Sequence, residues 1–122
     1  MRAIIVDDDA DRFEMLADIL EKHGFKSIAW CSTPFQAWGT IRTEKADLIL
    51  LDHDLKSTLT GQDVAYGFYE SVNKKTPVLV TSCNPVGAKA IMAILKSMNI
   101  PSIETPVTDV AKLQNGLGGL FG

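Results

Sequence analysis

The chain has 122 residues, of which 12 are basic and 15 acidic, so its formal net charge is −3. Hydrophobic residues make up 46% and charged residues 22%, values typical of one folded domain and not of a disordered chain. The mild acidity argues against a broad duplex-binding surface, which would carry a basic stripe. Without a signal peptide or a run of about 20 apolar residues, we expect no membrane span. The isolated cysteines Cys31 and Cys83 indicate a reducing cytoplasm.

Five short strands are expected from apolar runs along the chain. Three runs are apolar at every position, which is typical of strands buried on both faces of a parallel sheet. These are residues 3–6, 48–51 and 78–80. Residues 26–30 and 101–104 are weaker candidates.

Helical patterns alternate with these strands. The first has Phe13 and Leu16 on one apolar face and stops near Gly24. The second and fourth are expected to begin at a proline that follows a capping residue, Thr33 in one case and Asn84 in the other. Strand–helix alternation of this kind predicts an α/β domain with a parallel sheet, right-handed crossovers and helices on both faces.

The third and fifth helices have weaker patterns. The third follows Gly61 and is expected to turn Phe68 and Val72 inward. The fifth is short, from about Val107 to Gln114, because the Gly-rich tail at 115–122 ends it. We therefore expect one domain over residues 1–114, followed by a loose tail.

Polar residues follow four of the five expected strands. Asp7 and Asp8 come after the first, Asp52 after the third, Ser82 after the fourth and Thr105 after the fifth. Ligands of open α/β sheets bind at these carboxyl ends. Acids that converge there either share protons or hold a cation, and such oxygen ligands suit Mg²⁺, with Mn²⁺ as an alternative. The other interpretation is that the acids after the first strand only cap the first helix.

Three segments resemble the response-regulator receiver domains. Residues 4–9 (Ile-Ile-Val-Asp-Asp-Asp) and 47–52 (Asp-Leu-Ile-Leu-Leu-Asp) are similar to the first and third strand motifs of that family. Residues 77–82 (Pro-Val-Leu-Val-Thr-Ser) are similar to the fourth. The resemblance covers roughly residues 2–113. It implies a flavodoxin-like (βα)5 three-layer sandwich with strand order 2-1-3-4-5.

The same resemblance implies a role for each polar residue. Asp52 matches the phosphoacceptor, and Asp7 and Asp8 match the acidic pair that holds Mg²⁺. The backbone carbonyl of Asp54 falls where the family supplies a further metal ligand, and Ser82 matches the hydroxyl that bonds the phosphoryl group. The function implied is that of a stand-alone signalling domain, which takes a phosphoryl group from a phosphodonor and acts on a protein partner.

One departure from the family concerns a lysine. Receivers usually carry it before a proline at the end of the fifth strand, and here Thr105 stands in its place. Without that charge, an acyl phosphate would lose a charge-assisted hydrogen bond worth roughly 1.5–3 kcal/mol. Lys56 and Lys89 are candidates to replace it, although solvated surface positions are the more common place for lysine.

A narrower resemblance concerns residues 51–55, 60–64 and 82–87, which are similar to a receiver-derived group described as cyclic-phosphate processing domains. That group is thought to act on, or sense, phosphate ends of nucleotides or nucleic acids. Thr81 stands where the group usually has a histidine. In this interpretation His53 is a general acid or base, and a substrate phosphate is bound by Ser82, Asn84 and Gly87.

Three hypotheses therefore follow from the sequence. The domain is an atypical receiver that accepts a phosphoryl group on Asp52. Alternatively, it is a phosphoesterase-like domain that uses the same metal pocket on a phosphate end. Finally, it is a receiver-shaped interaction module whose pocket is inactive.

Overall fold

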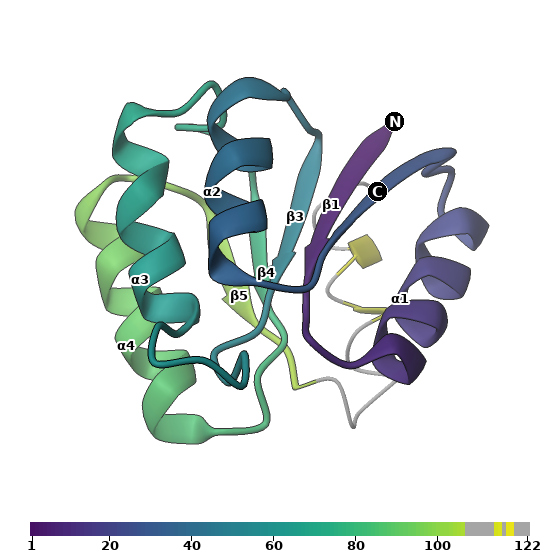
Figure 1. The fold of residues 1–122 in the computed structure, drawn as a ribbon. Helices are drawn as coiled ribbons and strands as arrows, with labels where there is room; N and C mark the ends of the chain where they lie inside the picture. Colours follow the sequence, from purple (N-terminus) through teal and green to yellow (C-terminus); the bar gives the residue numbers. More distant parts are fainter. Residues whose placement is uncertain (107–113, 116, 119–122) are drawn as a thin grey trace.

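The computed structural model describes residues 1–106, 114–115 and 117–118. These residues form a three-layer α/β sandwich (Figure 1). Its sheet has five parallel strands in the order β2-β1-β3-β4-β5, which confirms the expected flavodoxin-like topology. The strands are β1 (Arg2–Val6), β2 (Ser27–Cys31), β3 (Leu48–Leu51), β4 (Val78–Val80) and β5 (Ser102–Glu104).

Helices cover both faces of the sheet. Helix α1 (Ala10–Lys22) lies on one face, and the other face carries α2 (Pro34–Thr43), α3 (Gly61–Tyr66) and α4 (Pro85–Ser97), as Figure 1 shows. A short 3-10 helix, η1 (Gly67–Glu70), continues directly from α3.

The local sequence explains where these helices begin. The side chain of Asp9 accepts the N–H of Arg12 at 3.0 Å and caps α1. Thr33 caps α2 in the same way, with Pro34 at its first turn. Helix α4 begins at Pro85 after the expected cap, Asn84. Such side chains satisfy backbone donors that have no partner within the helix.

Two apolar clusters hold the layers together. Alternate residues of β1 point to opposite faces, so Ile4 and Val6 pack with α2, α3 and α4, whereas Ala3 and Ile5 pack with α1. Both sides of the sheet are therefore buried, and this explains why its central strands are apolar at every position. Leu117, from the segment expected to be a loose tail, is also buried in the α1 cluster.

The third helix is shorter than expected. It ends at Tyr66, η1 then carries the buried Phe68, and Val72 lies beyond both with 48% of its surface exposed. The prediction that Val72 faces inward is therefore wrong, because the helical period stops before it. The expected fifth helix, Val107–Gln114, lies outside the described residues except for its last residue.

Among the described residues, no helix is both long enough and apolar enough to cross a membrane.

Candidate functional site

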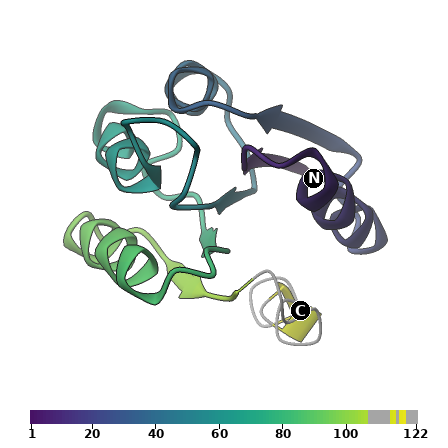
Figure 2. The same cartoon turned by 60° about the horizontal axis from the view of Figure 1, so that its bottom comes forward.

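The register of the sheet brings the polar residues to one edge. The first residue after each of β1, β3, β4 and β5 donates its backbone N–H to a carbonyl oxygen of the neighbouring strand at 2.8–3.1 Å. These residues are Asp7, Asp52, Thr81 and Thr105. Figure 2 turns this edge of the molecule toward the viewer. The strand ends that the sequence singled out therefore meet, as expected of a parallel sheet.

Three carboxylates form a cluster at this edge. Asp7, Asp8 and Asp52 each offer one oxygen, and these oxygens all lie within 4.8 Å of one another. Asp7 and Asp52 are only 1% and 6% exposed, and the side chain of Asp8 is 7% exposed. Oδ2 of Asp8 is buried and has no hydrogen-bond partner among the described residues. A buried carboxylate oxygen without a partner is costly, and this oxygen is one that a cation could bind.

Burial and repulsion make Asp52 a weaker acid than usual. The pKa of Asp52 is raised to about 6, first by burial and then by the negative charge of Asp7. The backbone N–H of His53, which donates to Oδ1 of Asp52 at 2.8 Å, and the charge of Arg12 oppose this shift. A cation near Oδ2 would favour the ionised carboxylate.

Arg12 is the site residue that sequence reasoning missed. Its guanidinium donates to Asp7 over 3.0–3.2 Å and to Oδ1 of Asp8 at 3.2 Å, and it lies 3.6 Å from Oδ2 of Asp52. Hydrogen bonding to Asp7 raises the pKa of Arg12, so the group stays charged. A signal was present, because Arg12 follows Asp8 by four residues and lies in the first turn of the helix that begins directly after these acids.

Aromatic residues fix the backbone at Asp7. The indole Nε1 of Trp30 donates to the carbonyl oxygen of Asp7 at 2.7 Å. The same ring stacks on Phe13, with centroids 4.7 Å apart and planes 12° apart. Trp30 therefore links β2 to the start of α1 and holds Asp7 in place.

His53 belongs to a second polar network beside the acids. Its Nδ1 lies 2.8 Å from Oδ1 of Asp54, and this hydrogen bond lowers the pKa of Asp54. The amide Nδ2 of Asn84 approaches the same oxygen at 3.5 Å. The His53 ring also packs on Gly87, where a Cβ atom would come within 2.4 Å of the ring. The glycine is thus required by the histidine.

The other expected phosphate ligands have protein partners. The Oγ of Ser82, which is buried, accepts the backbone N–H of Asn84 at 3.0 Å. The N–H of Gly87 donates to Oδ1 of Asn84 at 3.2 Å, as part of the α4 cap. Their assignment to phosphate binding remains a prediction.

Within residues 1–106, no lysine forms an ion pair with the acid cluster in place of the one that Thr105 replaces. Thr105 is buried at the end of β5. Among the residues that the structure describes, the ion pairs of the acid cluster all involve Arg12, and neither Lys56 nor Lys89 forms one with it. Arg12 is therefore the cation that partly balances the cluster.

The donor set of the cluster fits Mg²⁺ or Mn²⁺. Both are hard cations that prefer carboxylate oxygens and keep several waters. Asp7, Asp8 and Asp52 would hold the ion. The unpartnered Oδ2 of Asp8 supports this assignment from the structure itself.

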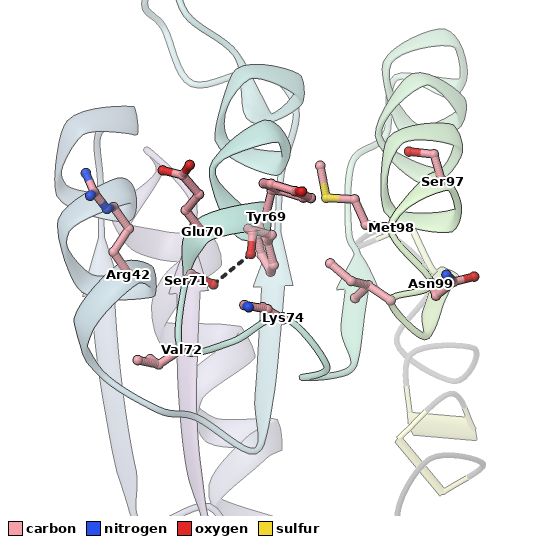
Figure 3. Close-up of a pocket in the computed structure, with 11 residues that line it drawn as sticks. Arg42, Tyr69, Glu70, Ser71, Val72, Lys74, Ser97, Met98 and Asn99 are labelled. Atoms are coloured by element: carbon pink, nitrogen blue, oxygen red, sulfur yellow. Dashed lines mark hydrogen bonds between the residues drawn. The ribbon is translucent and has the colours of Figure 1, made fainter.

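A large cavity lies at the opposite end of the sheet. It has a volume of about 950 Å³ and is lined by residues that precede β4 and β5 and by the end of α2. Figure 3 shows Arg42 and Glu70 on one side of it and Met98 and Asn99 on the other. None of the clustered acids lines this cavity, so size alone does not locate the chemistry of this domain.

Comparisons with known structures show the fold. A response regulator receiver domain (CheY-like) from Methylobacillus flagellatus is 18% identical with a TM-score of 0.78, and the match covers 98% of each chain. The receiver domain of a Pseudomonas aeruginosa sensor histidine kinase, solved with a magnesium ion coordinated in its active-site cleft, is 16% identical with a TM-score of 0.77, over 98% of this chain and 95% of that one. The response regulator TrrA from Thermotoga maritima, solved with Mg(2+)-BeF, is 18% identical with a TM-score of 0.72, over 98% of each chain.

Sequence comparison identifies the family. No curated protein gives a significant match to this chain. The family model described as "Response regulator receiver domain" matches residues 3–103. That span includes all of β1 but its first residue, the whole of β3 and β4, and the three acids that cluster at the ends of β1 and β3. The chain therefore belongs to the response regulator receiver domain family.

Proposed function

We propose that this receiver domain accepts a phosphoryl group on Asp52 with the help of a divalent cation held by Asp7, Asp8 and Asp52. The observation that carries the proposal is the meeting of three buried carboxylates at the ends of β1 and β3. Two structural relatives were solved with magnesium, one of them with Mg(2+)-BeF. On this proposal the backbone carbonyl of Asp54 completes the protein ligands of the ion.

The geometry at Asp52 leaves one oxygen for the reaction. Oδ1 accepts the N–H of His53, whereas Oδ2 faces the guanidinium of Arg12 at 3.6 Å. Oδ2 would attack the phosphorus of an acyl phosphate or a phosphohistidine. The new O–P bond forms as the bond from phosphorus to the donor breaks, and the donor leaves with that electron pair. The bound cation would neutralise charge on the phosphoryl oxygens.

The residues around Asp52 support this role in different ways. The hydroxyl of Ser82 is two positions from the end of β4 and would bond a phosphoryl oxygen. Thr105 supplies no charge in place of the usual lysine, so the acyl phosphate would be less stabilised than in a lysine-bearing receiver. On this proposal the domain works in the cytoplasm, takes its phosphoryl group from a phosphodonor and passes the signal to a protein partner.

A second candidate rests on the His53–Asp54 pair. A histidine that is oriented by a carboxylate beside a metal site is the arrangement expected of a general acid or base. Here Oδ1 of Asp54 lies 2.8 Å from Nδ1 of His53, the residue that follows Asp52, and the amide of Asn84 approaches the same oxygen. The second candidate is therefore a phosphoesterase that opens cyclic phosphates or binds a nucleotide phosphate end. In that case no phosphoryl group remains on Asp52.

Intact-mass spectrometry after treatment with acetyl phosphate and Mg²⁺ tests the first candidate. We expect the wild-type chain to gain one phosphoryl mass and Asp52→Asn to gain none, because the attacking oxygen is lost. Asp18→Asn is the matched control, since Asp18 is an exposed acid on α1. The control should label like the wild type.

The opposite result has a defined meaning. Absence of labelling, under conditions that label an ordinary receiver, would contradict the first candidate. If the same protein then opens a 2′,3′-cyclic nucleotide with Mg²⁺ or Mn²⁺, the second candidate is supported. Failure of both assays would leave a receiver-shaped module with an inactive pocket.

A further inference from the structure

The guanidinium of Arg12 lies at the centre of the acid cluster. It contacts both oxygens of Asp7 at 3.0–3.2 Å and Oδ1 of Asp8 at 3.2 Å. Its distance to Oδ2 of Asp52 is 3.6 Å. One planar cation therefore touches or approaches all three acids that would hold a metal ion.

These contacts use oxygens that a metal ion would also need. Both oxygens of Asp7 and one oxygen of Asp8 accept hydrogen bonds from Arg12, which leaves Oδ2 of Asp8 without a partner among the described residues. Arginine stays charged in proteins, so the guanidinium cannot release these oxygens by losing a proton. A divalent cation can bind the three acids only if the guanidinium moves away, because two positive groups would otherwise compete for the same small volume.

The surroundings provide a way for Arg12 to move. Its side chain is 37% exposed although the acids beneath it are buried. Asp9, whose side chain is 35% exposed, lies on the same helical turn with an oxygen 3.8 Å from Nη1 of Arg12. The guanidinium can therefore swing toward solvent and keep an acidic partner there, which makes the exchange less costly.

We propose that Arg12 is a built-in counter-cation of the acid cluster, and that a divalent metal ion must displace it to bind. This inference rests on the proposed metal site and adds a determinant of its affinity. Arg12 keeps the metal-free cluster from repelling itself and thereby weakens metal binding. The site then fills only when the free cation concentration is high enough to overcome a tethered competitor.

The test compares metal affinity in the full chain with and without this guanidinium. Arg12→Met removes the charge and keeps an unbranched side chain. Lys22→Met removes one positive charge from the same helix at an exposed pair with Asp18, so it controls for net charge. Affinity for Mn²⁺ is measured by calorimetry in all three proteins. We expect Arg12→Met to bind Mn²⁺ more tightly by about tenfold or more, and Lys22→Met to bind like the wild type.

A measurement on the wild-type protein tests the proposal without a variant that could misfold. In the wild-type protein, the NMR signal of the Arg12 side-chain Nε–Hε group should shift as Mg²⁺ saturates the site, because its acidic partners are withdrawn. A signal that stays in place at saturation would overturn the proposal. So would equal or weaker Mn²⁺ binding in a folded Arg12→Met protein, since Arg12 would then be a spectator or would position the ligands.

These outcomes separate the two proposals. If Asp52 is phosphorylated but all variants bind Mn²⁺ equally, only the proposed role of Arg12 is rejected, and the proposed function stands. If no protein in the series binds Mn²⁺, then the metal site and the competition at it are both rejected.

Discussion

Asp52 combines burial with repulsion from Asp7, and both disfavour its ionised form. Oδ1 is satisfied by the N–H of His53, but burial and the charge of Asp7 still raise the pKa of Asp52 to about 6. In the metal-free protein the ionised form is therefore disfavoured by the fold. Such a group is typical of a functional site and is not explained by stability.

This raised pKa predicts how stability depends on pH. Between the ordinary aspartate pKa of 3.8 and the raised pKa of about 6, the folded protein keeps a proton on Asp52 that the unfolded chain has already released. Stability contributed by Asp52 at low pH is therefore lost as the pH rises through about 6. Asp52→Asn removes this loss, so in EDTA at pH 7.5 it should raise the free energy of unfolding by about 1–3 kcal/mol. Near pH 4 the variant and the wild type should differ little.

Urea unfolding at the two pH values checks this prediction. Asp18→Asn, at an exposed position, should show no such dependence on pH. If Asp52→Asn instead destabilises the protein more at pH 7.5 than near pH 4, then the contact of Asp52 with Arg12 outweighs burial and the repulsion from Asp7.

At the scale of elements, the start of α4 and the loop after β3 fit each other through one glycine. The ring of His53 lies where a Cβ atom of residue 87 would be, and its Nδ1 is hydrogen-bonded to Asp54. Gly61 plays a similar part at the end of this loop, because a Cβ there would come within 1.9 Å of the carbonyl oxygen of Asp52. Both glycines allow the loop to stay close to the acid cluster.

Two glycine-to-alanine substitutions test this fit, because they should change the free energy of unfolding in opposite directions. Gly87→Ala should destabilise the protein by about 1–2 kcal/mol, because the new Cβ forces the His53 ring to move. Gly39→Ala is the matched control in α2, where no atom lies within 4 Å of the new Cβ. That change should stabilise by about 0.5–1 kcal/mol through helix propensity.

The measurement is thermal or urea unfolding, together with the NMR signals of the His53 ring. The ring signals should shift in Gly87→Ala and stay in place in Gly39→Ala. Equal stabilisation by both substitutions, with unmoved ring signals, would show that the histidine does not need the glycine.

The elements also show what the sequence can predict. Caps and prolines correctly located the starts of α2 and α4, because Thr33 and Asn84 satisfy backbone donors by purely local contacts. The prediction for Val72 was wrong because no local sequence signal marks the change from α3 to the 3-10 helix η1 after Tyr66. The position of Trp30 was predicted, but not its hydrogen bond to the carbonyl of Asp7, which depends on how β1 and β2 pair.

At the scale of the whole molecule, the strand order explains where the acids lie. Strand β1 lies between β2 and β3 in the sheet. The chain passes from β1 outward to β2 and then crosses back to β3 on the other side of β1, so the order of the strands reverses between β1 and β3. The edge beside this change is where open α/β sheets bind ligands. Asp7 follows β1 and Asp52 follows β3, and the parallel register then brings them together. Strand ends alone therefore sufficed to predict the acidic part of the site.

The balance of charge could not be predicted in the same way. A net charge of −3 averages the surface of the molecule with one concentrated acid cluster. The cation at that cluster comes from α1 and not from the position of the usual lysine, which Thr105 occupies. The ends of the predicted strands indicate which backbone positions lie together. They do not indicate which groups a long side chain such as that of Arg12 contacts, because that depends on the three-dimensional structure.

On the proposed function, Asp7, Asp8 and Asp52 form a single divalent-cation site. Paramagnetic broadening by substoichiometric Mn²⁺, recorded on the backbone amides of the labelled chain, tests it most directly. Amides next to Asp8 and Asp52 should lose intensity first, while those of Ser71 and Lys74 in the cavity at the other end stay sharp. Asp8→Asn should abolish this pattern. Broadening that begins instead around the exposed Asp18, or that is unchanged in Asp8→Asn, would contradict the account.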